Sequence, residues 1–225
     1  MDSTDDGTER VVTGGSAAPD TRQLQALHVP ESTPILDTIG FGTPYRIGST
    51  ALVPGAGELA ATIDGIDELD GLRLRSLQSD PAANGGAIPT GGEAEAAAHP
   101  NGVVSIDHVV VMTPNADRTH DAFAGAGIEA RRVRRFETKK GTHRQTFYWL
   151  GDVICEVAGA DDGRGDDPAS WWGLALTVAD IESTAAFFGD SCTPVKDAVQ
   201  PGRKVTTLRS PDSTTPILFI SEHVR

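Results

Sequence analysis

The sequence is poor in the residue types that mark several classes of protein. It holds two cysteines in 225 residues, Cys155 and Cys192, and they lack the Cys-x-x-Cys spacing of a zinc or redox pair. We therefore expect two small apolar side chains in a reducing compartment. No apolar run approaches the roughly 18 residues of a transmembrane helix, and the acidic N-terminus lacks the apolar segment of a signal peptide. These absences predict a cytoplasmic protein without a membrane partner.

Positive charge is scarce as well. Lysine and arginine total 19 against 32 aspartates and glutamates, which gives a formal net charge of -13. Such an acidic protein repels phosphate backbones, so the composition argues against a nucleic-acid partner. Aromatic residues make up only 5% of the chain, but hydrophobic residues reach 38%. That fraction is low, yet it is enough for a core in a chain of this length.

Composition and hydrophobic patterning divide the chain into four segments. Residues 1–20 are polar and acidic without periodicity, which predicts a disordered tail. Residues 21–78 form a β-rich N-terminal extension, and residues 79–102, rich in Gly, Ala and Pro, form a linker. Residues 103–225 carry the strongest patterns and make the predicted main domain. Within the extension we expect a strand at 24–28, a helix at 34–39, a hairpin over 45–53 and a strand at 58–63.

The pattern within the main domain occurs twice. Apolar, β-branched runs indicate strands, and a short polar stretch before a helical segment indicates a helix start in each half. The first half predicts a strand at 104–112, a helix at 119–126, and strands at 129–136, 144–150 and 153–157. The second half predicts a strand at 172–178, a helix from 180 to 188, and strands at 193–195, 204–209 and 217–221. The repeated order βαβββ predicts an α+β fold of tandem units.

Three phrases in these units resemble the vicinal oxygen chelate superfamily, which includes glyoxalase I, extradiol dioxygenases, methylmalonyl-CoA epimerase and bleomycin-resistance proteins. The phrases are Ile106–Val111, Leu150–Val157 and Gly173–Ile181, and Ser210-Pro211-Asp212 takes the place of the family's turn before the last strand. The resemblance implies a curved mixed sheet around a cleft that holds a small organic molecule. It also implies a homodimer, and it leaves open that residues 21–78 are a third, decayed βαβββ unit.

The resemblance further implies a metal site. His108 lies on the strand where the family keeps a histidine ligand, and Glu156 lies on the strand where glyoxalase-like members keep a glutamate. An imidazole and a carboxylate suit Zn, Ni, Mn or Fe(II), and Glu156 would also act as a proton shuttle. In the second unit the corresponding positions align with Gly173 and Ile217, so the predicted metal site is incomplete there.

A metal-free interpretation of the same two residues stays open. Strand alternation places His108 on the same face as Ile106 and Val110. There Glu156 would orient His108 or raise its pKa, which makes His108 a candidate general base. A purely structural histidine is the third alternative.

Other side chains are candidates for the wall of the cleft. Alternation puts Gln145, Phe147 and Trp149 on one face of their strand, where aromatic rings would stack on a ligand. Arg203 leads a strand and is a candidate carboxylate or phosphate clamp, and Ile217 completes the predicted set. The arginines within 131–135 indicate either a solvated edge strand or anion recognition. We expect Trp172 in the core, and Trp171 is a candidate for a lid or interface residue.

Three hypotheses about function follow. The first is a glyoxalase-like lyase, isomerase or dioxygenase, in which a divalent metal held by His108 and Glu156 polarises the substrate. The second is a metal-free protein that binds or sequesters a small molecule, as resistance proteins do. The third is a non-catalytic domain whose cleft is filled by residues 21–75.

Overall fold

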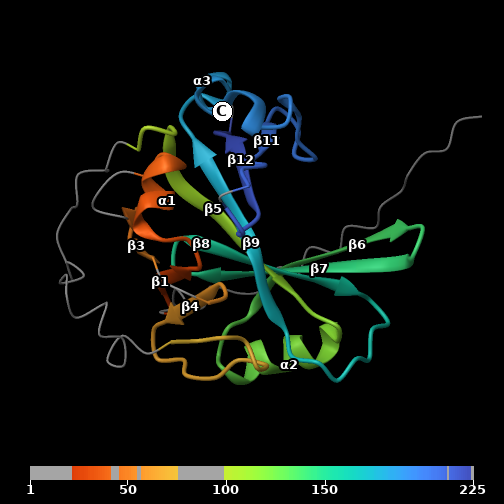
Figure 1. The fold of residues 1–225 in the computed structure, drawn as a ribbon. Helices are drawn as coiled ribbons and strands as arrows, with labels where there is room; N and C mark the ends of the chain where they lie inside the picture. The colour runs from red at the N-terminus through yellow and green to blue at the C-terminus, as the bar shows by residue number, and fades with distance from the viewer. Residues whose placement is uncertain (1–21, 42–45, 55–56, 76–98, 212, 224–225) are drawn as a thin grey trace, which may run out of the picture.

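The computed structural model describes residues 22–41, 46–54, 57–75, 99–211 and 213–223, which form two β-sheets and three α-helices (Figure 1). The predicted tail at 1–20 and most of the predicted linker at 79–102 lie outside the described residues. Within the described ranges, no helix combines the length and apolarity needed to cross a membrane.

The larger sheet has eight strands and contains both predicted units. The first unit comprises β5 (Val103–Met112), α2 (Ala116–Gly125), β6 (Ala130–Thr138), β7 (Gly141–Leu150) and β8 (Val153–Ala160). The second comprises β9 (Ser170–Val178), α3 (Ile181–Phe188), a 3-10 turn (Gly189–Ser191), β10 (Lys196–Asp197), β11 (Lys204–Thr207) and β12 (Ile217–Ser221). The strand order is β10-β11-β12-β9-β5-β8-β7-β6. The predicted α+β fold of tandem βαβββ units is confirmed.

Each unit is wound in the same way. Its first strand pairs in parallel with its last, β5 with β8 and β9 with β12, and the last pairs antiparallel with the third. The two first strands, β5 and β9, then pair antiparallel and join the units at the centre of the sheet. In Figure 1 the long hairpin of β6 and β7 projects away from the body of the molecule.

The two helices begin at equivalent caps. The Asn115 side chain accepts a hydrogen bond from the backbone N–H of Arg118, and Asp180 accepts one from Ser183, at 3.1 and 2.9 Å. Such caps satisfy N–H groups that the first helical turn leaves unpaired. With Asn115 as its cap, α2 begins at Ala116, three residues before the predicted start at residue 119. The short edge strand predicted at 193–195 is instead β10, at Lys196–Asp197.

The smaller sheet is built by the N-terminal extension. It comprises β1 (Leu24–Val29), α1 (Thr33–Thr38), β2 (Arg46–Ile47), β3 (Thr50–Pro54) and β4 (Ala60–Ile63), in the order β2-β3-β1-β4. These elements agree with those predicted for the extension. Gly40, at φ 81°, follows the helix in a conformation that favours glycine.

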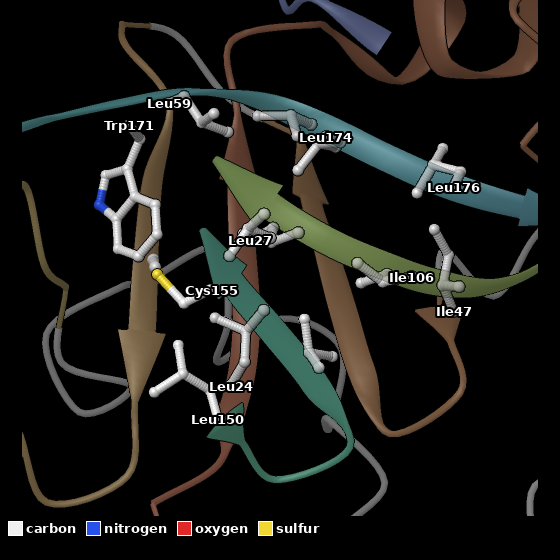
Figure 2. Packing of buried hydrophobic residues seen from close by; sticks show 14 of the residues in the cluster. Leu24, Leu27, Ile47, Leu59, Ile106, Leu150, Cys155, Trp171, Leu174 and Leu176 are labelled. Carbon is white, nitrogen blue, oxygen red and sulfur yellow. The ribbon is translucent and has the colours of Figure 1, made fainter. Parts of the chain in front are cut away.

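One hydrophobic core joins the two sheets. Figure 2 shows side chains of the small sheet, Leu24, Leu27 and Ile47, together with Ile106, Leu150, Cys155, Leu174 and Leu176 of the large one. Burying a leucine side chain stabilises a fold by roughly 1.5–3 kcal/mol, so these contacts fix the extension to the sheet. We call this side of the large sheet the core face.

A buried carboxylate adds a polar tie between the two parts. Glu31, 3% exposed, follows β1, and its Oε1 accepts hydrogen bonds from the backbone N–H groups of Thr214 and Thr215 at 2.9 and 2.8 Å. Its Oε2 accepts a third from the Thr215 hydroxyl at 2.9 Å. The extension is thereby held to the loop that precedes β12.

The tryptophan prediction is wrong. Trp171 is 8% exposed and its indole N–H donates to the Arg73 carbonyl oxygen at 3.0 Å, whereas Trp172 is 53% exposed. The reason is a β-bulge: Val110 pairs with Gly173 and Val111 pairs with Trp171, so Trp172 has no partner on β5. A bulge inserts one residue and reverses the alternation beyond it.

Candidate functional site

A second bulge shapes the candidate site, in β5. Ile106 pairs with Leu176 and His108 pairs with Ala175, which leaves Asp107 unpaired between them. Two consecutive polar side chains therefore turn to the same side of the sheet. Ile106 remains in the core, so the prediction that it shares a face with His108 is wrong. Asp107 and Trp172 occupy the same place in their units, so both units carry this bulge.

The side opposite the core face gathers a set of polar groups. We call it the polar face and define it by residues of β5, β7 and β8 and by one residue beside β11: Asp107, His108, Gln145, Phe147, Trp149, Glu156 and Arg203. The extension packs on the core face, which contradicts the hypothesis that its described residues fill a cleft on this side.

His108 lies between two carboxylates. Its Nδ1 is 2.8 Å from Asp107 Oδ2, and its Nε2 is 3.6 Å from Glu156 Oε2. The other oxygen of Glu156 accepts a hydrogen bond from Gln145 Nε2 at 2.6 Å. The side chains of His108, Asp107 and Glu156 are only 16%, 12% and 13% exposed. The histidine is thus held by a hydrogen bond at Nδ1 and has Glu156 close to its Nε2, while keeping some access to solvent.

Arg203 completes the network from the second unit. Its Nη1 is 2.6 Å from Asp107 Oδ1, and its Nε donates to the Ser221 carbonyl oxygen at 2.7 Å. The guanidinium also donates to Gln200 Oε1 at 3.0 Å, and only 2% of the side chain is exposed. Arg203 therefore lies on the predicted face, but its charge is already paired with Asp107.

These partners determine the charge on Asp107. Burial alone would raise the pKa of this carboxyl, but hydrogen bonds from His108 and Arg203 and the guanidinium charge outweigh it and lower the pKa. Asp107 is therefore ionised at neutral pH and can only accept hydrogen bonds. The Nδ1 of His108 must carry the proton in their bond, which leaves Nε2 of a neutral ring with its lone pair toward Glu156.

The structure brings most of the predicted residues together. Phe147 pairs with Glu156 and Trp149 pairs with Ile154, so the aromatic side chains border the carboxylate. Gln145 lies on the same face and contacts Glu156 directly. Sequence reasoning missed Asp107. The available signal was a charged residue directly before His108 in an apolar strand, but strict alternation assigned it to the other face.

Ile217 does not join this set. It pairs with Leu174, is 3% exposed and belongs to the core. A shift of one residue moves a strand's side chains to the opposite face, and the register predicted for β12 was off by that amount. Val110 pairs with Glu156 in the first unit, and its counterpart Ala175 pairs with Leu218. Leu218 therefore corresponds to Glu156.

Comparisons with known proteins find only distant likenesses. No family model and no curated protein matches the chain. Among solved structures, methylmalonyl-CoA epimerase from Mycobacterium tuberculosis is 11% identical, with 55% of this chain and 91% of that chain covered and a TM-score of 0.42. A mutant of glyoxalase I from Zea mays is 12% identical, with 91% and 70% covered and a TM-score of 0.39. A xylose isomerase-like TIM barrel/4-hydroxyphenylpyruvate dioxygenase fusion protein is 9% identical, with 90% and 49% covered and a TM-score of 0.49.

Such distant likenesses concern the fold alone. The repeated winding of the two units, with each first strand parallel to its own last strand, decides the assignment. The chain has the fold of the vicinal oxygen chelate superfamily. The fold does not determine a reaction, which depends on the side chains of the polar face.

The described side chains do not fit the metal centre that the superfamily implies. The first unit offers His108 and Glu156, and protein metal sites usually supply three or four ligands. In the second unit the counterpart of His108 is Gly173, where a Cβ would lie 2.5 Å from the Pro216 carbonyl oxygen. The counterpart of Glu156 is Leu218. Among the described residues, no group of three or more His, Cys, Asp or Glu side chains is placed to hold a metal ion.

Proposed function

We propose that the polar face is a metal-independent acid–base site that acts on a small organic molecule, with His108 as the proton carrier. The observation that carries the proposal is the position of His108 between Asp107 and Glu156, at 2.8 and 3.6 Å. A histidine whose tautomer is fixed by a carboxylate on one nitrogen is prepared to act as a base through the other.

Each polar group has a role in this proposal. His108 Nε2 takes a proton from a C–H or O–H group of the bound molecule and returns it to another atom, so no net charge or redox change results. Glu156, held by Gln145, receives or supplies that proton through its second oxygen. Asp107, held by Arg203, keeps the ring oriented. Phe147 and Trp149 provide aromatic surface for the ligand.

Deuterium exchange tests the proposal without knowledge of the natural substrate. Hydroxyacetone and pyruvate are incubated in D₂O with the protein and EDTA, and loss of the C–H signals is followed by proton NMR. We expect exchange above the protein-free rate, reduced at least tenfold in His108→Gln. His120→Gln is the matched control, because His120 contacts Tyr148 on α2, away from this face.

Two results would contradict the proposal. One is exchange that disappears with EDTA and returns with added Zn, Ni, Mn or Fe(II), since that requires a metal. The other is wild-type exchange at the protein-free rate with both probes. If the ligands nevertheless bind, as quenching of Trp149 would report (39% exposed on this face), the second hypothesis of a sequestering protein takes its place.

We also propose that the N-terminal sheet is a truncated βαβββ unit. The support is its pairing pattern. β1 is parallel to β3, β3 is antiparallel to β2, and β1 is antiparallel to β4. A complete unit has the same pattern. Its first strand is parallel to its last, its last strand is antiparallel to its third, and its first strand is antiparallel to the first strand of the next unit.

A further inference from the structure

Arginines are concentrated on the edge strand beside the candidate site. Residues 131–135 contain four of them in a chain with a net charge of -13. β6 is the last strand of the large sheet and pairs only with β7 among the described strands. Arg134 pairs with Gln145, and Arg132 pairs with Phe147. Both arginines therefore lie on the same side of the sheet as the residues of the polar face.

The neighbouring Arg135 has a different environment. It pairs with Arg144 in the β-ladder, on the other side of the sheet. Its Nε is 2.9 Å from Asp161 Oδ2, and Arg144 Nε is 3.1 Å from Asp161 Oδ1. The charge of Arg135 is thus matched by a carboxylate, which gives it a structural role.

Arg134 contacts uncharged groups instead. Its Nη1 donates to Gln145 Oε1 at 3.4 Å, and its guanidinium carbon lies 5.1 Å from the centre of the Phe136 ring. A ring face and an amide orient a guanidinium but do not neutralise it. Among the described residues, no carboxylate forms an ion pair with Arg134.

This cation is connected to the proton carrier. Gln145 accepts from Arg134 and donates to Glu156, which lies beside His108. Adjacent strands are about 4.8 Å apart, so β6 and β5 are separated by roughly 14 Å across β7 and β8. Part of that span is covered by the side chains themselves. A ligand that bridges the remainder is small, with a negative group several bonds away from its reacting atom.

We infer that Arg134 is an anion-binding residue of this site and that its ligand is a small organic acid whose carboxylate contacts Arg134. The guanidinium forms charge-assisted hydrogen bonds with a carboxylate, and Phe147 lies under the path between Arg134 and His108. The inference depends on the proposed function for the location of the reacting atom, but not for the binding of the anion.

Calorimetric titration with two isosteric probes tests the inference. The probes are 3-phenylpropanoate and its neutral amide, 3-phenylpropanamide. We expect the acid to bind at least tenfold more tightly than the amide to the wild-type protein. Arg134→Gln should remove that difference, Arg134→Lys should restore part of it, and Arg135→Gln should leave it unchanged. Thermal unfolding of each variant verifies that the fold is retained.

Three results would each overturn the inference. The wild-type protein could bind the acid and the amide equally, or it could show no binding of the acid. Arg134→Gln and Arg135→Gln could also lose the preference for the acid to the same extent. His108→Gln separates it from the proposed function. If this variant prefers the acid as wild type does while no protein catalyses deuterium exchange, the acid–base proposal fails and anion binding by Arg134 stands. If the wild-type protein catalyses exchange but does not prefer the acid, anion binding by Arg134 fails and the acid–base proposal stands.

Discussion

Arg203 and Asp107 form an ion pair across the junction of the two βαβββ units, with Nη1 and Oδ1 2.6 Å apart. Arg203 belongs to the second unit and Asp107 to the bulge of the first. The pair is almost completely buried, and through the second oxygen of Asp107 it fixes the ring of His108. The stability of the junction and the geometry of the candidate site therefore depend on the same contact.

Removing Arg203 should destabilise the protein strongly. Arg203→Met leaves Asp107 buried without its cation, and breaking a buried pair in this way costs about 3 kcal/mol or more. Equilibrium unfolding in urea measures the loss. Arg135→Met is the control, because Arg135 is 52% exposed and such pairs contribute less than about 1 kcal/mol. Similar losses in the two variants would contradict the structure.

The effect of Arg203→Met should depend on pH. The folded pKa of Asp107 lies below the 3.8 of an exposed aspartate. A carboxyl with a lowered pKa stabilises the fold fully above the unfolded pKa and loses that contribution as pH falls through the folded pKa. We therefore expect the difference in unfolding free energy between wild type and variant to be smaller at about pH 2.5 than near pH 6, because Asp107 without Arg203 takes up its proton at a higher pH than Asp107 of wild type. An equal difference at about pH 2.5 would count against an ionised Asp107.

Asp107→Asn should reverse the tautomer of His108. Arg203 only donates hydrogen bonds, so the amide oxygen of asparagine would turn to Arg203 and its NH₂ group to His108 Nδ1. The ring proton then moves to Nε2, and deuterium exchange should fall about 10²-fold. Long-range ¹H–¹⁵N NMR correlations of the ring distinguish the two tautomers. Asp117→Asn, which affects a residue of α2 paired with Arg144, should change neither measurement.

Gly173→Ala tests why the second unit lacks a ligand. The added Cβ would lie 2.5 Å from the Pro216 carbonyl oxygen, and overpacking of this kind costs about 1–3 kcal/mol. Gly125→Ala provides the comparison, since a Cβ there meets nothing within 4 Å. Thermal unfolding should show a lower Tm for the first variant only. An unchanged Tm in Gly173→Ala would mean that the position is open to a side chain.

The tandem units were predictable because their signals are local. Runs of β-branched residues, a polar cap such as Asp180 and a glycine after each helix each reflect the conformation of a few neighbouring residues. The pairing of His108 with Glu156 came from the resemblance, since nothing local joins strands that far apart in sequence. The shared face of Gln145, Phe147 and Trp149 followed from alternation in a regular strand.

The errors arose where a strand departs from regular alternation. The bulges at Asp107 and Trp172 insert a residue without changing the composition. Strict alternation therefore placed Asp107 on the wrong face, and the expected burial of Trp172 was wrong. The face predicted for Ile217 was wrong for a related reason, because the register of β12 depends on its pairing with β9. The packing of the extension on the core face depends on contacts between distant segments, such as Glu31 with Thr215.

Metal content tests the central claim most directly, since the account assigns the chemistry to His108 without a metal. Wild type, His108→Ala and Glu156→Ala are each incubated with Zn, Ni, Mn and Fe(II), desalted, and measured by inductively coupled plasma mass spectrometry. The account predicts well below one equivalent of any metal in wild type and no difference among the three proteins. About one equivalent in wild type, lost in both variants, would contradict it and show that a further ligand completes a metal centre.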